Sequence, residues 1–250
     1  MRNSNRPGAM SSTVISLAER SGPETLVRQA MNAVTAYIRD AHLKVGDPLP
    51  GEMHFAQELG VSRAVMREAF GALAALRLID VGNGRRPRVS AFDSAAIAAS
   101  LDHAVNTAQI SVPQVWDVRR TLERRTAALA AMCRTDQEAE EILRHAHAMV
   151  THRNDFEVMT QHDVALHQAI ARASHNVLFA QVVASFGVLM TEAVPVAWKT
   201  RTSEEQRAGV LDRHIMIAEA IAGRDPMAAE AAMEGHFDDS IKRLLDSGMT

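Results

Sequence analysis

The stretch that decides the fold of the front of the chain runs from residue 51 to residue 76 and reads GEMHFAQELG VSRAVMREAF GALAAL. Gly60 separates two segments rich in helix-forming residues. Ser62 comes directly after that turn, where its hydroxyl can accept a hydrogen bond from a free backbone amide. We therefore predict one helix over 51–59, a glycine turn, and a second helix from Ser62 to about Leu76, with Val65, Ala69, Ala72, Leu73 and Leu76 facing inward.

The flanking sequence completes a small domain around this pair of helices. Apolar residues recur at three- and four-residue steps over 23–41, which predicts a preceding helix. Two short apolar runs at 78–81 and 88–90 enclose the turn-forming residues GNGRRP, which predicts a hairpin. Three helices followed by a hairpin describe a winged helix-turn-helix, whose third helix lies in the DNA major groove.

Candidate DNA contacts lie at the start of that third helix and on the hairpin. Arg63 and Arg67 are four residues apart, so both guanidinium groups share one face and can reach a phosphate or a guanine edge. The alternative is that Arg63 and Arg67 lie on the solvated face of an ordinary helix. The three arginines on the hairpin, Arg85, Arg86 and Arg88, favour the DNA-binding interpretation instead. The candidate DNA-binding residues are Ser62, Arg63, Ala64, Met66, Arg67, Arg85, Arg86 and Arg88.

From residue 93 onward the pattern is helical, without strand-like alternation after Ser90. We predict helices near 93–107, 112–133, 136–151, 155–175, 177–199, 203–222 and 226–247. The segments Thr135-x-x-Glu138 and Thr202-x-x-Glu205 have capping-box spacing, Asp225 is a predicted N-cap, and Gly223 and Gly248 are predicted helix-ending glycines. The fold class is mainly α, with the winged helix-turn-helix followed by an all-α antiparallel helical bundle. The predicted division is a flexible extension over 1–22, a DNA-binding domain over 23–91, and a domain for metal, effector and dimerisation over 92–250.

Composition and charge agree with this division. Hydrophobic residues make up 47% of the 250, which excludes a wholly disordered chain. Cys133 is the single cysteine, which excludes an internal disulfide framework. Residues 1–91 hold 12 Lys and Arg against 8 Asp and Glu, a net of +4, whereas residues 92–250 hold 15 against 22, a net of −7. A basic front suits a polyanion partner. The lack of an export signal or an apolar run long enough for a membrane favours a cytoplasmic protein.

Four residues of the helical part form a candidate metal site. Asp163 and His167 are one turn apart on a predicted helix, and His214 and His236 lie among apolar residues on the last two helices. Three imidazoles and a carboxylate from three helices suit a divalent transition metal. From the residues alone, the i, i+4 spacing of Asp163 and His167 is a weak signal for a metal and favours the alternative of a buried histidine hydrogen bonded to a carboxylate. His145, His147 and His152 fit solvated positions, and His162 lies 100° away from Asp163.

The front of the chain resembles the DNA-binding domain of the GntR family of bacterial transcription regulators. The segments that carry the resemblance are Leu49-Pro-Gly-Glu-Met-His-Phe-Ala56, Leu59-Gly-Val-Ser-Arg63 and Val65-Met-Arg-Glu-Ala69. Relatives usually carry an arginine where this chain has Met53, and that arginine commonly touches DNA. The departure affects the operator sequence rather than the mode of binding.

Residues 93–247 resemble the helical FCD domain of the FadR subfamily. The matching segments are Val118-Arg119, Leu122-Glu123, Asp163-x-x-x-His167, His214-x-x-Ile and Ala232-Met-x-x-His236. The resemblance implies a divalent metal on Asp163, His167, His214 and His236, with zinc preferred over nickel or manganese. It also implies that Arg119 pairs with the carboxylate of a small organic acid effector, against the alternative of a surface salt bridge to Glu123.

These observations predict a transcription regulator, in repressor mode, rather than an enzyme. Its expected partners are operator double-stranded DNA, a small carboxylate effector and a second copy of the chain, and no membrane. The alternatives are a metal-responsive regulator without an organic effector, an architectural DNA-binding protein, and a metal-dependent hydrolase using Glu123 or Glu192 as the base.

Overall fold

The computed structural model describes residues 23–82 and 84–246, so the predicted extension over 1–22 and a predicted helix-ending glycine at 248 lie outside the described residues. The chain divides into two compact units, and the boundary in the sequence lies between Ala96 and Ile97. Each unit has its own hydrophobic core. Within the described residues, helices dominate and the strands are confined to one short pair.

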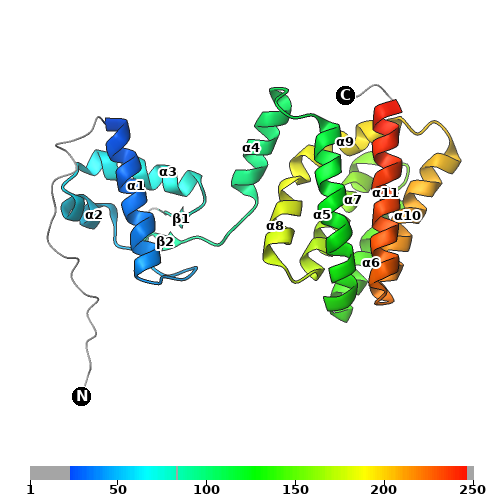
Figure 1. Cartoon of the computed structure of the whole chain (residues 1–250), viewed down its shortest axis with the longest axis horizontal. Coiled ribbons are helices and arrows are strands. Elements are labelled where there is room, and N and C mark those ends of the chain that lie inside the picture. The colour runs from blue at the N-terminus through cyan, green and yellow to red at the C-terminus, as the bar shows by residue number, and fades with distance from the viewer. Residues whose placement is uncertain (1–22, 83, 247–250) are drawn as a thin grey trace, which may run out of the picture. The chain divides into compact units, whose positions relative to one another are not determined.

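The first unit contains the predicted helix-turn-helix (Figure 1). Its elements are α1 (Pro23–Asp40), α2 (Glu52–Leu59), α3 (Arg63–Ala75), β1 (Ile79–Asp80) and β2 (Arg88–Val89). Gly60 ends α2 in the left-handed conformation with φ of 66°, and the hydroxyl of Ser62 accepts a hydrogen bond from the amide of Val65. Both predicted signals at this turn are therefore confirmed.

The core of this unit corrects part of the predicted inward face of α3. Met66, which we had expected among the DNA-reading residues, is completely buried, and Phe70 is buried beside it. Leu76, expected inside, is 52% exposed. The buried residues of α3 are Met66, Ala69, Phe70 and Leu73, so Ala69 and Leu73 are confirmed, while Val65 and Ala72 are half-buried. Phe70 packs against Phe55 of α2 with ring centroids 5.9 Å apart.

The hairpin is tied to the turn that precedes α2. Strands β1 and β2 are antiparallel, with Ile79 opposite Val89 and Asp80 opposite Arg88. The Arg88 guanidinium donates a hydrogen bond of 2.6 Å to the carbonyl of Gly46. Gly46 has φ of 85°, a conformation that glycine adopts readily. The wing is thus anchored at its base.

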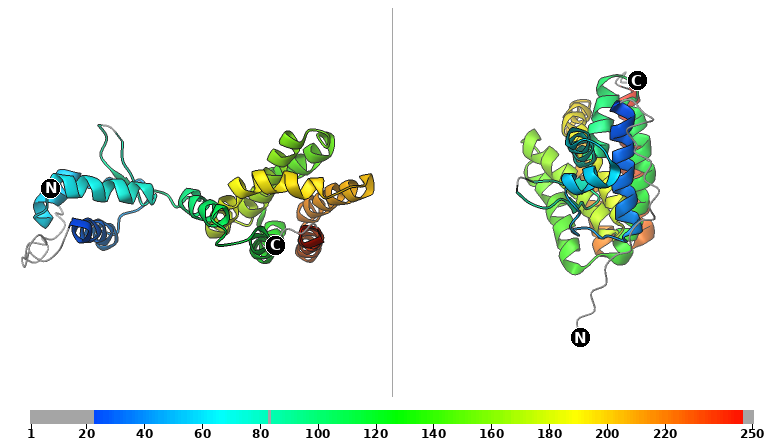
Figure 2. Two further views of the ribbon diagram at one scale, coloured as in Figure 1. Left: turned by 90° about the horizontal axis from the view of Figure 1, so that it is seen from above. Right: turned by 90° about the vertical axis from the view of Figure 1, so that its left-hand side faces the viewer.

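The second unit is a helical bundle (Figure 1). Its helices are α4 (Ala95–Asn106), α5 (Val112–Cys133), α6 (Asp136–Thr151), α7 (Phe156–Ala173), α8 (Val177–Ser185), α9 (Gly187–Lys199), α10 (Glu204–Ala222) and α11 (Pro226–Asp246). Figure 2 shows α5 and α11 lying side by side, and ion pairs link them along their outer faces. The buried faces of α5, α7, α10 and α11 meet at the centre of the bundle.

Helix ends in this unit confirm most of the predicted caps and correct two details. Thr135 and Glu138 form the predicted reciprocal capping box, and Asp225 caps α11. The cap of α10 is Ser203 rather than the predicted Thr202, because the Ser203 hydroxyl accepts from the amide of Gln206. The helix predicted over 177–199 is broken at Phe186 into α8 and α9, which are bent by 54°.

Among the described residues, no single helix is long and apolar enough to span a membrane. The bent pair formed by α8 and α9 is the one combination that meets the same test of length and composition.

Candidate metal site and nucleic-acid interface

The α7 helix places Asp163 and His167 on its buried face. Asp155 caps the start of this helix by accepting a hydrogen bond from the amide of Val158. The four-residue spacing then directs the two side chains to the same side, as predicted. Both are almost fully buried, with 6% and 3% of their surface exposed.

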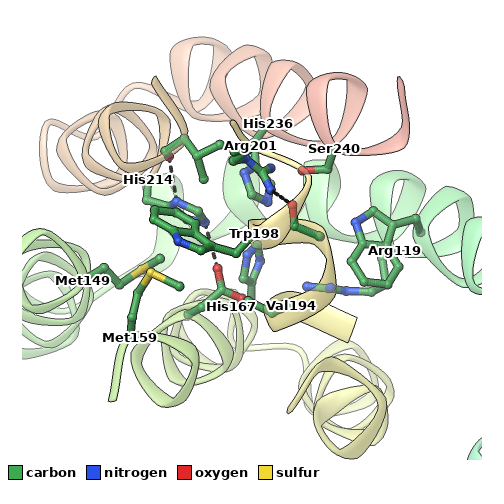
Figure 3. A pocket seen from close by; sticks show the side chains of 14 residues that line it. Arg119, Met149, Met159, His167, Val194, Trp198, Arg201, His214, His236 and Ser240 are labelled. Atoms are coloured by element: carbon green, nitrogen blue, oxygen red, sulfur yellow. Dashed lines mark hydrogen bonds and ion pairs between the residues drawn. The ribbon is translucent and has the colours of Figure 1, made fainter. Parts of the chain in front are cut away.

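His214 of α10 and His236 of α11 meet this pair at the centre of the bundle. The ring centroid of His236 lies 4.4 Å from that of His214 and 5.2 Å from that of His167. One ring nitrogen from each of the three histidines lies within 4.8 Å of the others. The Asp163 Oδ1 atom lies 3.2 Å from His214 Nε2. The structure therefore brings together all four residues that the sequence proposed (Figure 3).

Hydrogen bonds to the far side of two rings determine which nitrogen faces the cluster. The carboxylate of Glu123 accepts from Nδ1 of His167, and the carbonyl of Val210 accepts from Nδ1 of His214 at 2.8 Å. Because both acceptors require an N–H at Nδ1, the neutral rings keep their lone pairs on Nε2. Such outer contacts orient metal-ligating histidines in general.

The ring nitrogens that have no hydrogen-bond partner test whether a metal fits this site. His167 Nε2, His214 Nε2 and His236 Nδ1 are buried and have no hydrogen-bond partner among the described residues. The contact between His214 and Asp163 is short enough for an ion pair but lacks hydrogen-bond alignment. Three buried imidazole nitrogens without partners are unfavourable unless a cation occupies the space between them. The residues present therefore fit a divalent metal of the nitrogen-and-oxygen type.

The electrostatics also favour the ligand protonation states that a metal needs. Burial, followed by the neighbouring His214, His167 and Arg119, holds the pKa of His236 well below 6.5. Burial acts to raise the pKa of Asp163, but contacts with the two histidines outweigh it and bring the pKa to about 2. At neutral pH the imidazole is unprotonated and the carboxyl is ionised, and both states can ligate a metal.

Arg119 lies beside this cluster and is paired with Glu123. The Arg119 Nε atom lies 2.6 Å from Glu123 Oε1, and the side chains of the two residues are 4% and 1% exposed. The alternative reading of an Arg119–Glu123 salt bridge was therefore right about the pair and wrong about its surface location. Arg119, Trp116, Trp198 and Ser240 line a cavity of about 30 Å³ next to the histidines. Arg119 stays our predicted effector contact, since it faces this cavity.

The remaining histidines of the bundle lie elsewhere. His162 points away from the cluster, and its Nδ1 lies 3.0 Å from Nδ1 of His145. His145 is consequently half-buried, which corrects its predicted solvated position, whereas His147 and His152 are exposed as expected. His175 is exposed and pairs with Glu138 at 3.0 Å.

In the first unit, the start of α3 presents an exposed polar surface. Ser62, Arg63, Ala64 and Arg67 are all exposed. Arg67 is the most open of the ion-paired residues here, with its side chain 80% exposed and 3.8 Å from Glu52. The Arg63 guanidinium lies 2.7 Å from the sulfur of Met53, the residue that departs from the family pattern.

The wing adds further exposed arginines. Arg85 lies 3.9 Å from Asp80 across the hairpin, and Arg86 is exposed nearby. Arg88 is exposed too, but its guanidinium is engaged with Gly46 at the base of the wing. Arg85 and Arg86 are therefore freer than Arg88 to reach a DNA backbone, and the DNA-contact set stays a prediction.

Two residues at the candidate metal site, Glu123 and Trp198, were not predicted from the sequence to belong to it. Glu123 was considered only as a base for hydrolysis or as the surface partner of Arg119, yet it orients His167 from α5. Trp198 of α9 lines the cavity and was not singled out. Their sequence positions lie 44 and 31 residues from His167, so no local spacing connects them to the site. The available signal was a glutamate four residues after Arg119 on the buried face of α5.

Comparisons with known proteins agree with both units. Residues 26–89 match the bacterial regulatory proteins of the gntR family, and residues 114–239 match the FCD domain. The chain is 30% identical over 220 residues to the Glc operon transcriptional activator of Escherichia coli (strain K12), covering 86% of this chain and 87% of that protein.

Two further similarities are more distant. The Galactonate operon transcriptional repressor of Escherichia coli (strain K12) is 26% identical over 207 residues, covering 80% of this chain and 89% of that protein. The solved structure of Streptococcus agalactiae GntR superposes with a TM-score of 0.61 at 23% identity, covering 86% of this chain and 99% of that one. At that level of identity, the structural likeness supports the fold alone.

Proposed function

The chain belongs to the GntR family of bacterial DNA-binding transcription regulators and carries an FCD domain, and from this premise we propose that a divalent metal and a small carboxylate effector control its binding to operator DNA. The observation that carries the proposal is the set of three buried, unpaired imidazole nitrogens around Asp163. The metal is held by Asp163, His167, His214 and His236, with zinc preferred over nickel or manganese.

The metal supplies a Lewis-acidic position at which an effector carboxylate binds. Arg119 faces the same cavity and offers a guanidinium for a bidentate contact with that carboxylate. One relative is a galactonate operon repressor, and galactonate is a hydroxylated carboxylate, which agrees with an effector of this chemical class. We propose that residues 92–250 form this sensor and that residues 23–91 bind the operator, in the bacterial cytoplasm.

A homodimer is part of the proposal. A palindromic operator presents two half-sites about 34 Å apart, which one recognition helix cannot contact alone. The helical domain supplies the interface, and the effector favours one mutual arrangement of the two DNA-binding domains over the other. Relatives include an operon activator and an operon repressor, and we propose the repressor mode for this chain.

The test is a gel-shift titration of the full-length protein on a DNA fragment selected by binding from a random pool. We expect metal-loaded protein to bind the fragment and a hydroxycarboxylate to release it. Equal DNA affinity of metal-loaded and chelated protein, with no response to any organic acid, would contradict the proposal. Release by metal removal alone would favour the metal-responsive alternative.

A further inference from the structure

The space beside the three histidines is too small for an organic acid of ordinary size. The cavity has a volume of about 30 Å³. One water molecule needs roughly 10–15 Å³ measured in this way, so the cavity has room for about two or three waters. A carboxylate group fits beside a metal there, but the rest of an effector has to extend into neighbouring space.

Trp198 is shared with a second cavity. We call it the outer cavity; its volume is about 140 Å³, and its lining includes Trp198, Arg153, Asn154, Phe156, Leu211 and Asp212. Trp198 lines both this cavity and the one beside the histidines. A ligand that reaches from one to the other therefore lies along the indole of Trp198.

Trp198 carries an unused hydrogen-bond donor at this junction. Only 4% of the residue is exposed, and its Nε1 atom is buried without an acceptor among the described residues. Buried indole N–H groups usually find a partner, because leaving one unpaired is unfavourable. An oxygen of a ligand that spans the two cavities supplies the missing acceptor.

Three polar side chains of the outer cavity are also without partners. Within the described residues, Arg153, Asn154 and Asp212 form no side-chain hydrogen bond or ion pair, whereas Arg207 and Glu204, which line the same cavity, pair with each other. Arginine donates, aspartate accepts and asparagine does both. This mixture matches hydroxyl groups, which also donate and accept, better than it matches a second carboxylate.

A competing direction leads across Trp116. The cavity there has a volume of about 130 Å³ and is lined mainly by apolar side chains, including Val112, Val115 and Leu189. It suits an alkyl chain. Among the described residues the indole of Trp116 has no comparable orphan donor, so the observations favour the outer cavity.

We propose that the effector is a linear polyhydroxy carboxylate of the sugar-acid type. Its carboxylate lies at the histidine cluster, its hydroxylated chain passes Trp198 and accepts a hydrogen bond from Nε1, and its tail lies in the outer cavity against Arg153 and Asp212. The inference rests on the proposed function and adds the length and polarity of the ligand.

The test is isothermal titration of zinc-loaded, full-length protein with three acids: L-lactate, D-gluconate and 2-hydroxyoctanoate. We expect D-gluconate to bind at least tenfold more tightly than L-lactate. The Trp198→Phe variant should lose roughly five- to tenfold in affinity for D-gluconate, the effect of one hydrogen bond. L-lactate affinity should change less than twofold in that variant.

Two further variants keep the test decisive. Asp212→Asn changes an exposed residue and should weaken the binding of D-gluconate without changing that of L-lactate. This variant tests the inference even if Trp198→Phe fails to fold. Glu205→Gln, an exposed residue of the same helix outside the cavity, should change nothing. Equal affinity for L-lactate and D-gluconate, or tighter binding of 2-hydroxyoctanoate, overturns the inference and leaves the proposed function standing. Binding of none of the acids overturns both.

Discussion

His167 and Glu123 form a buried pair in which the carboxylate accepts the Nδ1–H of the imidazole. Burial acts to raise the pKa of Glu123, but Arg119 and His167 outweigh it and lower the pKa, so the carboxyl stays ionised. An ionised carboxylate cannot donate, and the free lone pair of His167 is therefore fixed on Nε2. The metal-binding form of one proposed ligand thus depends on a residue outside the proposed ligand set.

Replacing Glu123 with glutamine should lower metal affinity by about ten- to 100-fold, the usual effect of losing an outer contact to a metal-ligating histidine. The measurement is competition for zinc with a chromophoric chelator, with circular dichroism to confirm that the helices remain. Glu192→Gln, on the exposed surface of α9, is the matched control. Unchanged affinity in Glu123→Gln would show that His167 does not need this partner.

Metal should stabilise the helical unit because its ligands come from three helices. At a hundredfold excess over Kd, the free energy of unfolding should rise by about 2.7 kcal/mol. The His214→Ala variant should lose most of this increase, and His147→Ala, an exposed residue, should keep it. The readouts are metal content by elemental analysis and thermal unfolding with and without chelator. Full metal occupancy in His214→Ala, or its loss in His147→Ala, would mean that the ligands are wrongly assigned.

Local signals were sufficient to predict most helix ends. The glycine after α2, the serine before α3 and the Thr135 capping box act within a few residues, so their sequence spacing determines their geometry. The four metal-ligand candidates were likewise found from helical spacing and from a family pattern, and the bundle brings them together.

Features that depend on packing between distant segments were not predictable. The break at Phe186 separates two apolar helices whose composition alone predicts one continuous helix. His145 is half-buried only because α6 places it against His162 of α7. Met66 is buried in the same core as the aromatic pair Phe55 and Phe70. Each of these outcomes depends on a neighbour that is not close in sequence.

The metal-free protein should become less stable as the pH falls below about 6.5. The pKa of His236 is well below 6.5 in the folded chain and returns to about that value on unfolding, so the unfolded state binds the extra proton. Asp163 does not add to the change in this range, because its folded pKa is about 2. Urea unfolding of chelated protein at about pH 7.5 and about pH 5.5 measures the difference.

The matched variant for this pH dependence is His236→Phe, which removes the buried imidazole and should make the profile shallower. The slope that remains should come from His145 and His162, because burial also lowers the pKa of each of these histidines. His103→Ala, on the exposed face of α4, should leave it unchanged. A His236→Phe profile as steep as that of the parent protein would assign the acid sensitivity to other groups.

DNA binding should depend on Arg67, whose side chain is 80% exposed at the start of α3 and lies no closer than 3.8 Å to the carboxylate of Glu52. At this separation the guanidinium can exchange its contact with Glu52 for one with a phosphate or a guanine edge. Arg67→Ala should therefore weaken binding to the selected DNA fragment by about 1–3 kcal/mol, roughly five- to 150-fold, without changing oligomeric state. Gel-shift titrations at several salt concentrations separate the two kinds of contact. Loss of a phosphate contact should reduce the salt slope by about 1 and weaken binding to all sequences alike, whereas loss of a base contact should relax sequence preference at one position.

Arg39→Ala, an exposed arginine at the end of α1 that pairs with Asp40, provides the matched control. If Arg67→Ala binds as tightly as the parent protein while Arg39→Ala does not, the DNA-reading surface has been assigned to the wrong helix.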